Sequence, residues 1–168
     1  NYDLNAKIQF RNFNKRDGLG SDYIYHIIID RKNRVWFATD GNGITLYDGG
    51  KFFNYGVDQG LKSKIIYSIT EDRSGVMWLS SSGEGIFRFD KNSFRNVTAD
   101  QGLSDVNITA LVTDKWGNVI VVSKKGIDVL NPDKMQILSY GNEMGINNLD
   151  PDINVVDTDR KGNVWIGY

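Results

Sequence analysis

The sequence repeats itself about every 42 residues, and this period limits the possible folds more than any other feature. A Gly-Leu pair recurs at Gly18, Gly60 and Gly102, and a Gly-Ile pair follows at Gly145. A second marker runs in phase with it, and its members are Asp30, Asp72, Asp114 and Asp159. The two markers are 12 residues apart in three copies and 14 apart in the last, which therefore carries a two-residue insertion. Such periods indicate solenoids, propellers or arrays.

Each unit contains four short segments with strand character. Gly, Asn and Asp interrupt the apolar pattern so often that a helix of ten or more residues does not fit. The first segment, Ile24–Ile29, recurs as Ile66–Glu71, Ile108–Thr113 and Ile153–Thr158, and its nearly continuous apolar character predicts a strand buried on both faces near a propeller axis. The second begins at Val35, and its Trp36 is predicted to pack between blades. The third, residues 43–48, and the fourth, around Phe52, are expected to face more solvent.

These segments predict an all-β fold, a β-propeller of four-stranded blades. The predicted boundaries are the end of a blade in 1–14, whole blades in 15–56, 57–98 and 99–141, and the first half of a blade in 142–168. In the first stretch, Tyr2 and Asp3 resemble the end of a third strand, and Phe10 and Phe13 mark a fourth. The content is about four blade equivalents. The chain is thus a partial propeller, or its half blades complete one another within a small ring or between two copies.

Composition narrows the function classes. Twenty Lys plus Arg against twenty-one Asp plus Glu give a formal charge of −1, so the chain lacks the excess of positive charge that favours nucleic-acid binding. The absence of cysteine excludes disulfides, thiolate metal sites and a cysteine nucleophile. Apolar runs are far shorter than the roughly 20 residues of a membrane helix, and no signal-peptide pattern opens the sequence.

A third marker, an apolar residue at Phe10, Phe52, Phe94 and Ile137, runs in phase with the other two. Three markers in phase over four copies give a specific family resemblance. The pattern in the second unit is Gly60 Leu61, Ile69, Glu71 Asp72, Gly75, Trp78, Gly83 Glu84 Gly85 Ile86, Phe89 Asp90 and Phe94. It resembles the repeat of the two-component regulator propellers. The third unit departs from this pattern, because Ile120 replaces Trp and Lys124 Lys125 Gly126 replaces Gly-x-Gly.

The resemblance implies a function. In that family, propellers form the extracytoplasmic part of sensor proteins, usually as seven-bladed units in tandem, followed by a small β-sandwich, a membrane helix and a cytoplasmic histidine kinase. This chain would then be a fragment of a seven-bladed propeller. It would be a non-catalytic, periplasmic sensor segment that detects an oligosaccharide or another small molecule. The rest of a membrane-anchored sensor kinase would pass the signal on through a phosphorelay.

The residues themselves provide no enzyme site, cofactor site or metal site. The single histidine, His26, has small or apolar residues at its place in the other units, which favours a structural role. The carboxylate pairs Asp150 with Asp152 and Asp157 with Asp159 could suggest Ca²⁺ or glycosidase chemistry. Their positions beside Pro151 and in the repeat's turn favour turn formation. The Gly-rich loops lack the following helix that a phosphate site needs.

Loops at one face of the propeller are the candidate ligand site. The loop between second and third strands and the loop leading into each first strand lie on the same face around the axis, where propellers commonly bind ligands or partners. Residues there differ between units while the framework does not. The candidates are Asp22, Asp40, Asn42, Lys64, Ser82, Glu84, Asp105, Lys124 and Lys125.

Two other functions stay open. A carbohydrate-active propeller enzyme would need carboxylates or a partnered His at the axis, where the first strands supply mostly Ile, Val and Thr. A protein-interaction scaffold of the WD-repeat kind would show Gly-His and Trp-Asp signatures, and here Trp is followed by Phe, Leu or Ile. Open blade edges further predict self-association, for example as a homodimer.

Overall fold

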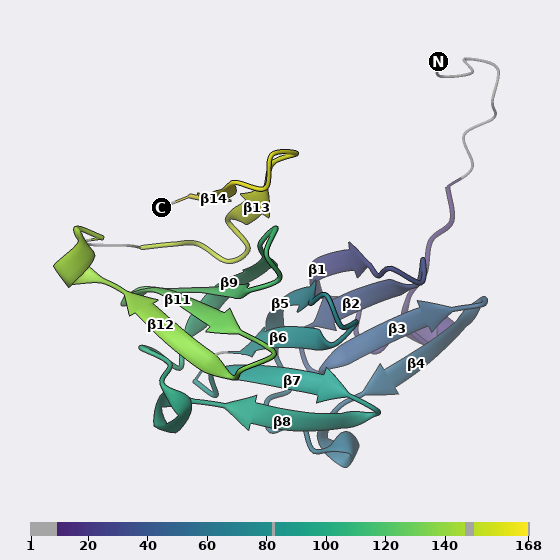
Figure 1. The fold of residues 1–168 in the computed structure, drawn as a ribbon. Helices are drawn as coiled ribbons and strands as arrows, with labels where there is room; N and C mark the ends of the chain where they lie inside the picture. Colours follow the sequence, from purple (N-terminus) through teal and green to yellow (C-terminus); the bar gives the residue numbers. More distant parts are fainter. Residues whose placement is uncertain (1–9, 82, 147–149, 168) are drawn as a thin grey trace.

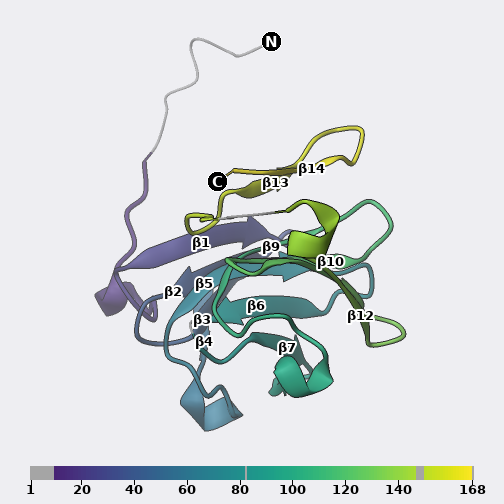
Figure 2. The same cartoon turned by 90° about the vertical axis from the view of Figure 1, so that its left-hand side faces the viewer.

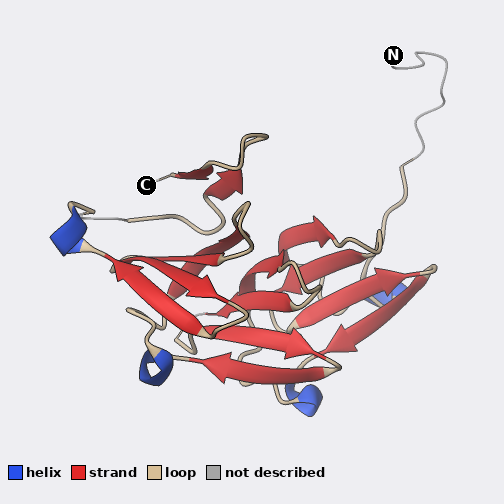
Figure 3. Ribbon diagram, viewed as in Figure 1, coloured by secondary structure: helices blue, strands red, loops and turns tan. Residues whose placement is uncertain are grey.

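The computed structural model describes residues 10–81, 83–146 and 150–167, which form a series of antiparallel β-sheets (Figures 1 and 3). Blade A contains β1 (Ile24–Ile29), β2 (Val35–Thr39), β3 (Ile44–Asp48) and β4 (Lys51–Tyr55). Blade B contains β5 (Ile66–Glu71), β6 (Met77–Ser81), β7 (Ile86–Asp90) and β8 (Ser93–Val97). Blade C contains β9 (Ile108–Thr113), β10 (Val119–Ser123), β11 (Gly126–Asn131) and β12 (Gln136–Tyr140). Half-blade D contains β13 (Val156–Thr158) and β14 (Val164–Ile166).

The blades follow one another around a common axis. Within each blade the strands pair in chain order, and successive blades meet through their first strands, β1 with β5, β5 with β9 and β9 with β13. In Figure 2 the β13–β14 hairpin lies above β1 and β9. Single-turn 3-10 helices lead into the blades: η1 (Lys15–Asp17), η2 (Val57–Gln59), η3 (Ala99–Gln101) and η4 (Asn142–Met144). The predicted fold class, a propeller of four-stranded blades with a 42-residue repeat, is confirmed.

In the repeats that carry a Trp after the Asp turn, these two residues form one hydrogen-bonded unit. In blade B, Asp72 Oδ1 accepts from the backbone N–H of Ser74 at 2.8 Å and of Val76 at 3.1 Å, which closes the β5–β6 turn. Its Oδ2 accepts from Nε1 of Trp78 at 2.8 Å. Asp30 and Trp36 repeat the contact in blade A at 2.8 Å. The carboxylate therefore fixes both the turn and the orientation of the indole that packs against the next blade.

The third unit keeps this turn without a Trp. Asn118 Nδ2 donates to Asp114 Oδ2 at 3.0 Å, so a side-chain amide takes the place of the indole N–H. Blade A differs in another way, because Asn33 stands where other units have Gly. Its φ of 61° is close to the 81° of Gly75, as expected for the residue type that best tolerates the left-handed region.

Apolar cores lie between blades, and two of them contain a buried tryptophan. Trp36 and Trp78 are 3% and 0% exposed. Trp36 packs edge-on against Phe89 of blade B with ring centroids 5.9 Å apart. Trp78 joins Leu111 and Val119 of blade C in the next core. The predicted packing of Trp between blades is confirmed for these two, while Trp165 of half-blade D is 65% exposed.

The first strand of blade A departs from the prediction of burial on both faces. Ile27 and Ile29 are 53% and 66% exposed, whereas Ile69 and Leu111, which occupy the place of Ile27 in blades B and C, are 0% and 2% exposed. The difference has a simple cause. Burial of this face comes from the preceding blade, and among the described residues blade A has no four-stranded blade before it.

The segment before blade A is also not the strand that was predicted. Residues 10–14 contain no strand, and the predicted third strand around Tyr2 and Asp3 lies outside the described residues. Phe13 nevertheless packs on Tyr47 with ring centroids 5.3 Å apart. Tyr55 and Phe89, each 42 residues later, make the same contact at 4.8 Å. Phe13 thus takes the place of a preceding blade's fourth strand.

The first strand of the last half-blade begins later than predicted. A strand was expected from Ile153 to Thr158, but β13 starts only at Val156. Pro151 has no N–H to donate to a neighbouring strand, and Asn154 has a φ of 61°, which breaks the extended conformation.

We predict that the open faces make the 168-residue chain self-associate. Trp165, Ile27 and Ile29 occupy positions that neighbouring blades cover elsewhere in the molecule, so association would bury them as it buries Trp78. Sedimentation velocity should show dimers or larger species that Ile27→Lys with Ile29→Lys weakens. A folded monomer at all concentrations would contradict the prediction.

Candidate functional site

The predicted loop face is built by contacts between neighbouring blades. In the β2–β3 loop, the backbone N–H groups of Gly41 and Gly43 both donate to the carbonyl of Lys64 at 3.0 Å, just before β5. In the β6–β7 loop, Gly85 N–H donates to Val106 O at 2.8 Å, just before β9. Each loop between second and third strands therefore meets the segment that leads into the next blade.

The structure divides the nine candidate residues among several environments. Asn42 and Lys64 line a cavity between blades A and B, and Asp105 and Lys124 line another beside half-blade D. The remaining candidates lie outside these two cavities. Asp22 accepts from Lys15 N–H at 2.9 Å, Asp40 accepts from the Tyr25 hydroxyl at 3.1 Å, Glu84 is half-buried, Lys125 is exposed, and Ser82 lies outside the described residues.

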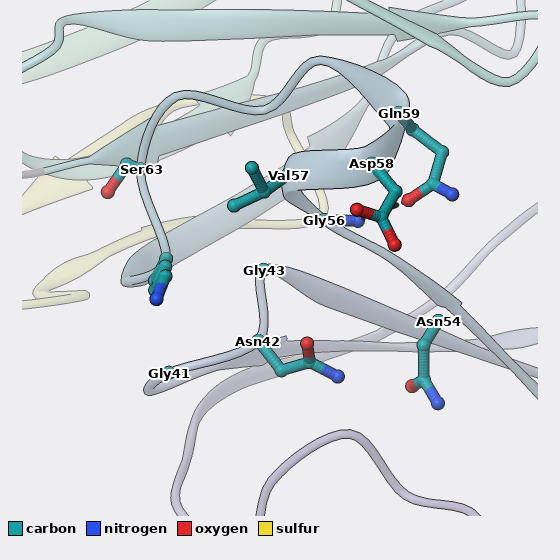
Figure 4. A pocket seen from close by; sticks show the side chains of 10 residues that line it. Gly41, Asn42, Gly43, Asn54, Gly56, Val57, Asp58, Gln59 and Ser63 are labelled. Atoms are coloured by element: carbon teal, nitrogen blue, oxygen red, sulfur yellow. Dashed lines mark hydrogen bonds between the residues drawn. The ribbon is translucent and has the colours of Figure 1, made fainter.

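The A–B cavity has a volume of about 310 Å³ and a polar lining (Figure 4). Asp58 and Gln59 of η2 lie on one side, and Asn42 and Asn54 on the other. Several of these groups already serve the framework. Gln59 Oε1 accepts from Gly56 N–H at 2.7 Å, and Asn54 Oδ1 accepts from the Thr45 hydroxyl at 2.7 Å. Because these acceptors are occupied, the cavity has fewer free hydrogen-bond acceptors for a ligand.

The larger C–D cavity has a volume of about 500 Å³. Its lining residues come from blade B, from blade C and from the inserted segment, residues 150–153 before β13. The lining residues are Tyr67, Asp105, Asn107, Ile108, Thr109, Lys124, Asp150, Pro151, Asp152 and Ile153. An aromatic ring, an amide, a hydroxyl and ionic groups thus surround one space, which is the composition of a site for a polar small molecule.

Charged groups of the C–D cavity are held by local contacts. Asp105 is 8% exposed, and its Oδ1 accepts from the backbone N–H of Val106 at 2.7 Å and of Asn107 at 3.1 Å. Lys124 Nζ lies 2.5 Å from Asp150 Oδ1, so an ion pair ties blade C to the inserted segment. The hydrogen bond to Asp150 raises the pKa of Lys124, which stays protonated at neutral pH.

Sequence reasoning missed a set of residues near the starts of the first strands. Tyr25, Tyr67 and Thr109 are the second residues of β1, β5 and β9, and Asn154, at the same repeat position, lies just before β13. Asn154 Nδ2 donates to the carbonyls of Tyr25 at 2.9 Å and of Tyr67 at 2.7 Å, which connects the segment before β13 to blades A and B. The signal was available, because this position varies between units inside an otherwise apolar segment.

His26 connects blades, and its Nδ1 lies 3.4 Å from the hydroxyl oxygen of Ser68. Its Nδ1 accepts from Ile69 N–H at 3.2 Å. Ser68, one unit later, accepts from Leu111 N–H through its hydroxyl at 3.0 Å. Burial lowers the pKa of His26, and Asp157 opposes this effect. The ring therefore stays neutral at physiological pH and acts as a hydrogen-bond acceptor between first strands.

The described residues provide neither a metal centre nor a membrane span. Within 10–81, 83–146 and 150–167, no three His, Asp or Glu side chains are grouped so that they could hold a metal ion. The helices in that part of the chain are single turns, and none of them could cross a bilayer.

Comparison with known proteins identifies the repeat. Residues 18–41 and 60–83 match the family described as two component regulator propeller, which confirms the resemblance seen in the sequence. These segments run from the Gly-Leu pair through the Asp turn to the loop after the second strand. A search of curated proteins found no match.

Solved structures with the same architecture support this result. The extracellular domain of a Bacteroides hybrid two-component system (B. thetaiotaomicron) shares 30% identity at a TM-score of 0.75, over 89% of this chain and 22% of that one. A second such domain from the same organism shares 24% identity at a TM-score of 0.82, over 98% and 23%. The chain therefore spans about a fifth of these proteins. Virginiamycin B lyase of Staphylococcus aureus, at 16% identity, 83% and 47% coverage and a TM-score of 0.66, shares the fold alone.

Proposed function

We propose that this chain, which carries two-component regulator propeller repeats, is a non-catalytic ligand-binding segment of a sensor histidine kinase. We place it in the periplasm, in the part of the sensor outside the cytoplasm. The likeness to extracellular domains of hybrid two-component systems supports this proposal. The first strands support it too, because in the described residues they carry mostly apolar, Ser and Thr side chains, their two carboxylates are Glu71 and Asp157, and burial keeps His26 neutral.

The C–D cavity is the proposed ligand site, and an oligosaccharide is the proposed ligand. The observation that carries this step is the half-buried ring of Tyr67 beside the amide of Asn107 and the hydroxyl of Thr109 in one cavity of about 500 Å³. An aromatic ring can cover the C–H face of a sugar, while amide, hydroxyl and carboxylate groups exchange hydrogen bonds with its hydroxyls.

The same site offers a route for the signal. Ligand contacts with Asp150, Asp152 or Ile153 would act on the segment that ends at Asn154, whose amide holds the carbonyls of Tyr25 and Tyr67. A ligand that favours one position of this segment would shift the arrangement of blades A, B and D. A change of arrangement in a dimer would then bias the kinase across the membrane.

Tyr67→Ala tests this function. An array of neutral, acidic and amino oligosaccharides should show binding of the wild-type chain to at least one class. Loss of the aromatic face is expected to weaken that binding about tenfold, since aromatic contacts contribute roughly 0.5–1.5 kcal/mol beyond burial. Tyr23→Ala is the matched control, because Tyr23 is 75% exposed and outside both cavities.

Thermal melting of both variants separates lost binding from lost folding. A folded Tyr67→Ala chain that binds as tightly as wild type would contradict the assignment of the cavity. A wild-type chain that binds no sugar on the array would contradict the sensor function proposed for this segment.

A further inference from the structure

We propose that the ligand of the C–D cavity carries a positive charge, as does an amino sugar whose nitrogen is not acetylated. This inference rests on the proposed function of the cavity and adds the chemical class of its ligand. It follows from three observations: the balance of charge in the lining, the repeat position of Asp105, and the burial of that side chain.

The lining of the cavity has more negative than positive charge. Asp105, Asp150 and Asp152 line it together with one cation, Lys124. Lys124 is paired with Asp150, so the positive charge of the lining is already matched by one carboxylate. The carboxylates of Asp105 and Asp152 leave a net charge of −2 in the described lining. An anionic sugar would be repelled there, and a cation would be attracted.

The turn that begins at Asp105 does not require a charged side chain. The same repeat position is Ser21 before blade A and Ser63 before blade B. Ser21 Oγ accepts from Tyr23 N–H and Ser63 Oγ accepts from Ile65 N–H, each at 3.2 Å. Asp105 Oδ1 makes the equivalent bond to Asn107 N–H at 3.1 Å. A neutral hydroxyl therefore meets the structural need in two units, while the C–D cavity has a carboxylate.

Burial strengthens the effect of this carboxylate. Asp105 is 8% exposed, so little water screens it, and a charge in such a place interacts more strongly than one on the open surface. A ligand ammonium in the cavity would approach it from the cavity side. Asp152 is exposed and would contribute less, because water and salt screen it.

Three β-1,4-linked tetrasaccharides with the same ring geometry test the inference: one of glucose, one of glucosamine and one of glucuronic acid. Calorimetric titration of the full chain, at a pH where the amines are protonated, should rank glucosamine first, glucose second and glucuronic acid last. We expect about tenfold between the first two at low salt, as one to two screened charges imply. Raising the salt from about 0.01 M to about 1 M, which shortens the Debye length from ~30 Å to ~3 Å, should reduce this difference only in part, because salt screens the exposed Asp152 much more than the buried Asp105.

Asp105→Ser is the decisive variant. Its hydroxyl should keep the turn, as Ser63 does, and thermal melting checks this. The variant should lose most of the preference for glucosamine over glucose. Asp100→Asn is the matched control, because Asp100 is exposed on η3 and does not line the cavity.

The outcomes separate the two proposals. Equal binding of glucose and glucosamine, tighter binding of glucuronic acid, or an Asp105→Ser chain that keeps the preference would each overturn the inference and leave the sensor function standing. If the chain binds none of the three while the array shows another neutral or acidic sugar bound, the inference also fails alone. If no sugar binds in either experiment, both proposals fail.

Discussion

Replacing Trp78 by Ala is expected to lower the free energy of unfolding by about 3–5 kcal/mol, whereas the same change at Trp165 should cost about 1 kcal/mol or less. The two residues occupy the same repeat position. Trp78 is 0% exposed in the core between blades B and C, and Trp165 is 65% exposed. The pair therefore measures how much stability comes from a following blade and how much from the repeat itself.

Removing the Trp78 ring would leave a cavity and an unmatched acceptor. Asp72 is 2% exposed, and its Oδ2 would lose the indole N–H at 2.8 Å. Trp165 Nε1 makes the corresponding bond to Asp159 at 3.2 Å in an exposed setting, where water can replace it. Hydrogen bonds from Asn163, the backbone and Trp165 hold the pKa of Asp159 at about 2, so its carboxylate stays charged in either variant.

Urea unfolding, followed by circular dichroism, measures both losses. If Trp78→Ala does not fold, Trp78→Phe keeps much of the apolar volume, removes the N–H together with part of the indole ring, and should cost about 1–3 kcal/mol. Equal losses at Trp78 and Trp165 would contradict the inter-blade account of stability.

Gly85→Ala is expected to cost about 3 kcal/mol or more, against about 1 kcal/mol for Gly60→Ala. Both glycines have a positive φ, 73° and 90°, so both variants bear the strain of a side chain in that region. They differ in the space around them. A Cβ at Gly85 would lie 2.4 Å from the carbonyl oxygen of Val97, whereas Gly60 has no heavy atom within 4 Å.

The close approach at Gly85 belongs to the framework of the repeat. Gly43 and Gly126 stand at the same place, where a Cβ would lie 2.5 Å and 2.2 Å from the carbonyls of Tyr55 and Tyr140. The second Gly of Gly-x-Gly therefore lets the start of each third strand touch the end of the fourth. Denaturation of the two variants tests this. Similar losses at Gly85 and Gly60 would show that backbone conformation alone, and not the contact, selects glycine here.

The strands and turns were accessible from the sequence because they depend on local chemistry that recurs. Ile66–Glu71 and Ile108–Thr113 were predicted with the bounds that β5 and β9 show. The exposure of Ile27 and Ile29 was not accessible, because burial depends on which blade lies beside the strand. The late start of β13 was missed because the repeat suggested a strand where Asn154 has a left-handed conformation.

The candidate site was predicted in part for a related reason. Asp105 and Lys124 were found because loop residues that differ between units stand out against a constant framework. Tyr67 was missed because it lies inside a first strand, which the apolar pattern marked as core. Asp150 was interpreted as a turn residue, and only the folded chain shows its carboxylate beside Lys124. An ion pair between a repeat loop and an inserted segment depends on the folded position of that segment, which the repeat pattern does not predict.

Site-resolved nuclear magnetic resonance titration tests the central claim, that the C–D cavity is the ligand site of this propeller, most directly. With the glucosamine tetrasaccharide and, in parallel, the glucose tetrasaccharide, we expect backbone shifts at Tyr67, Asn107 and Lys124 that saturate together. We expect no comparable shifts at Asn42 in the A–B cavity. Shifts centred on the A–B cavity, or binding of either sugar that leaves Tyr67, Asn107 and Lys124 unshifted, would contradict the claim.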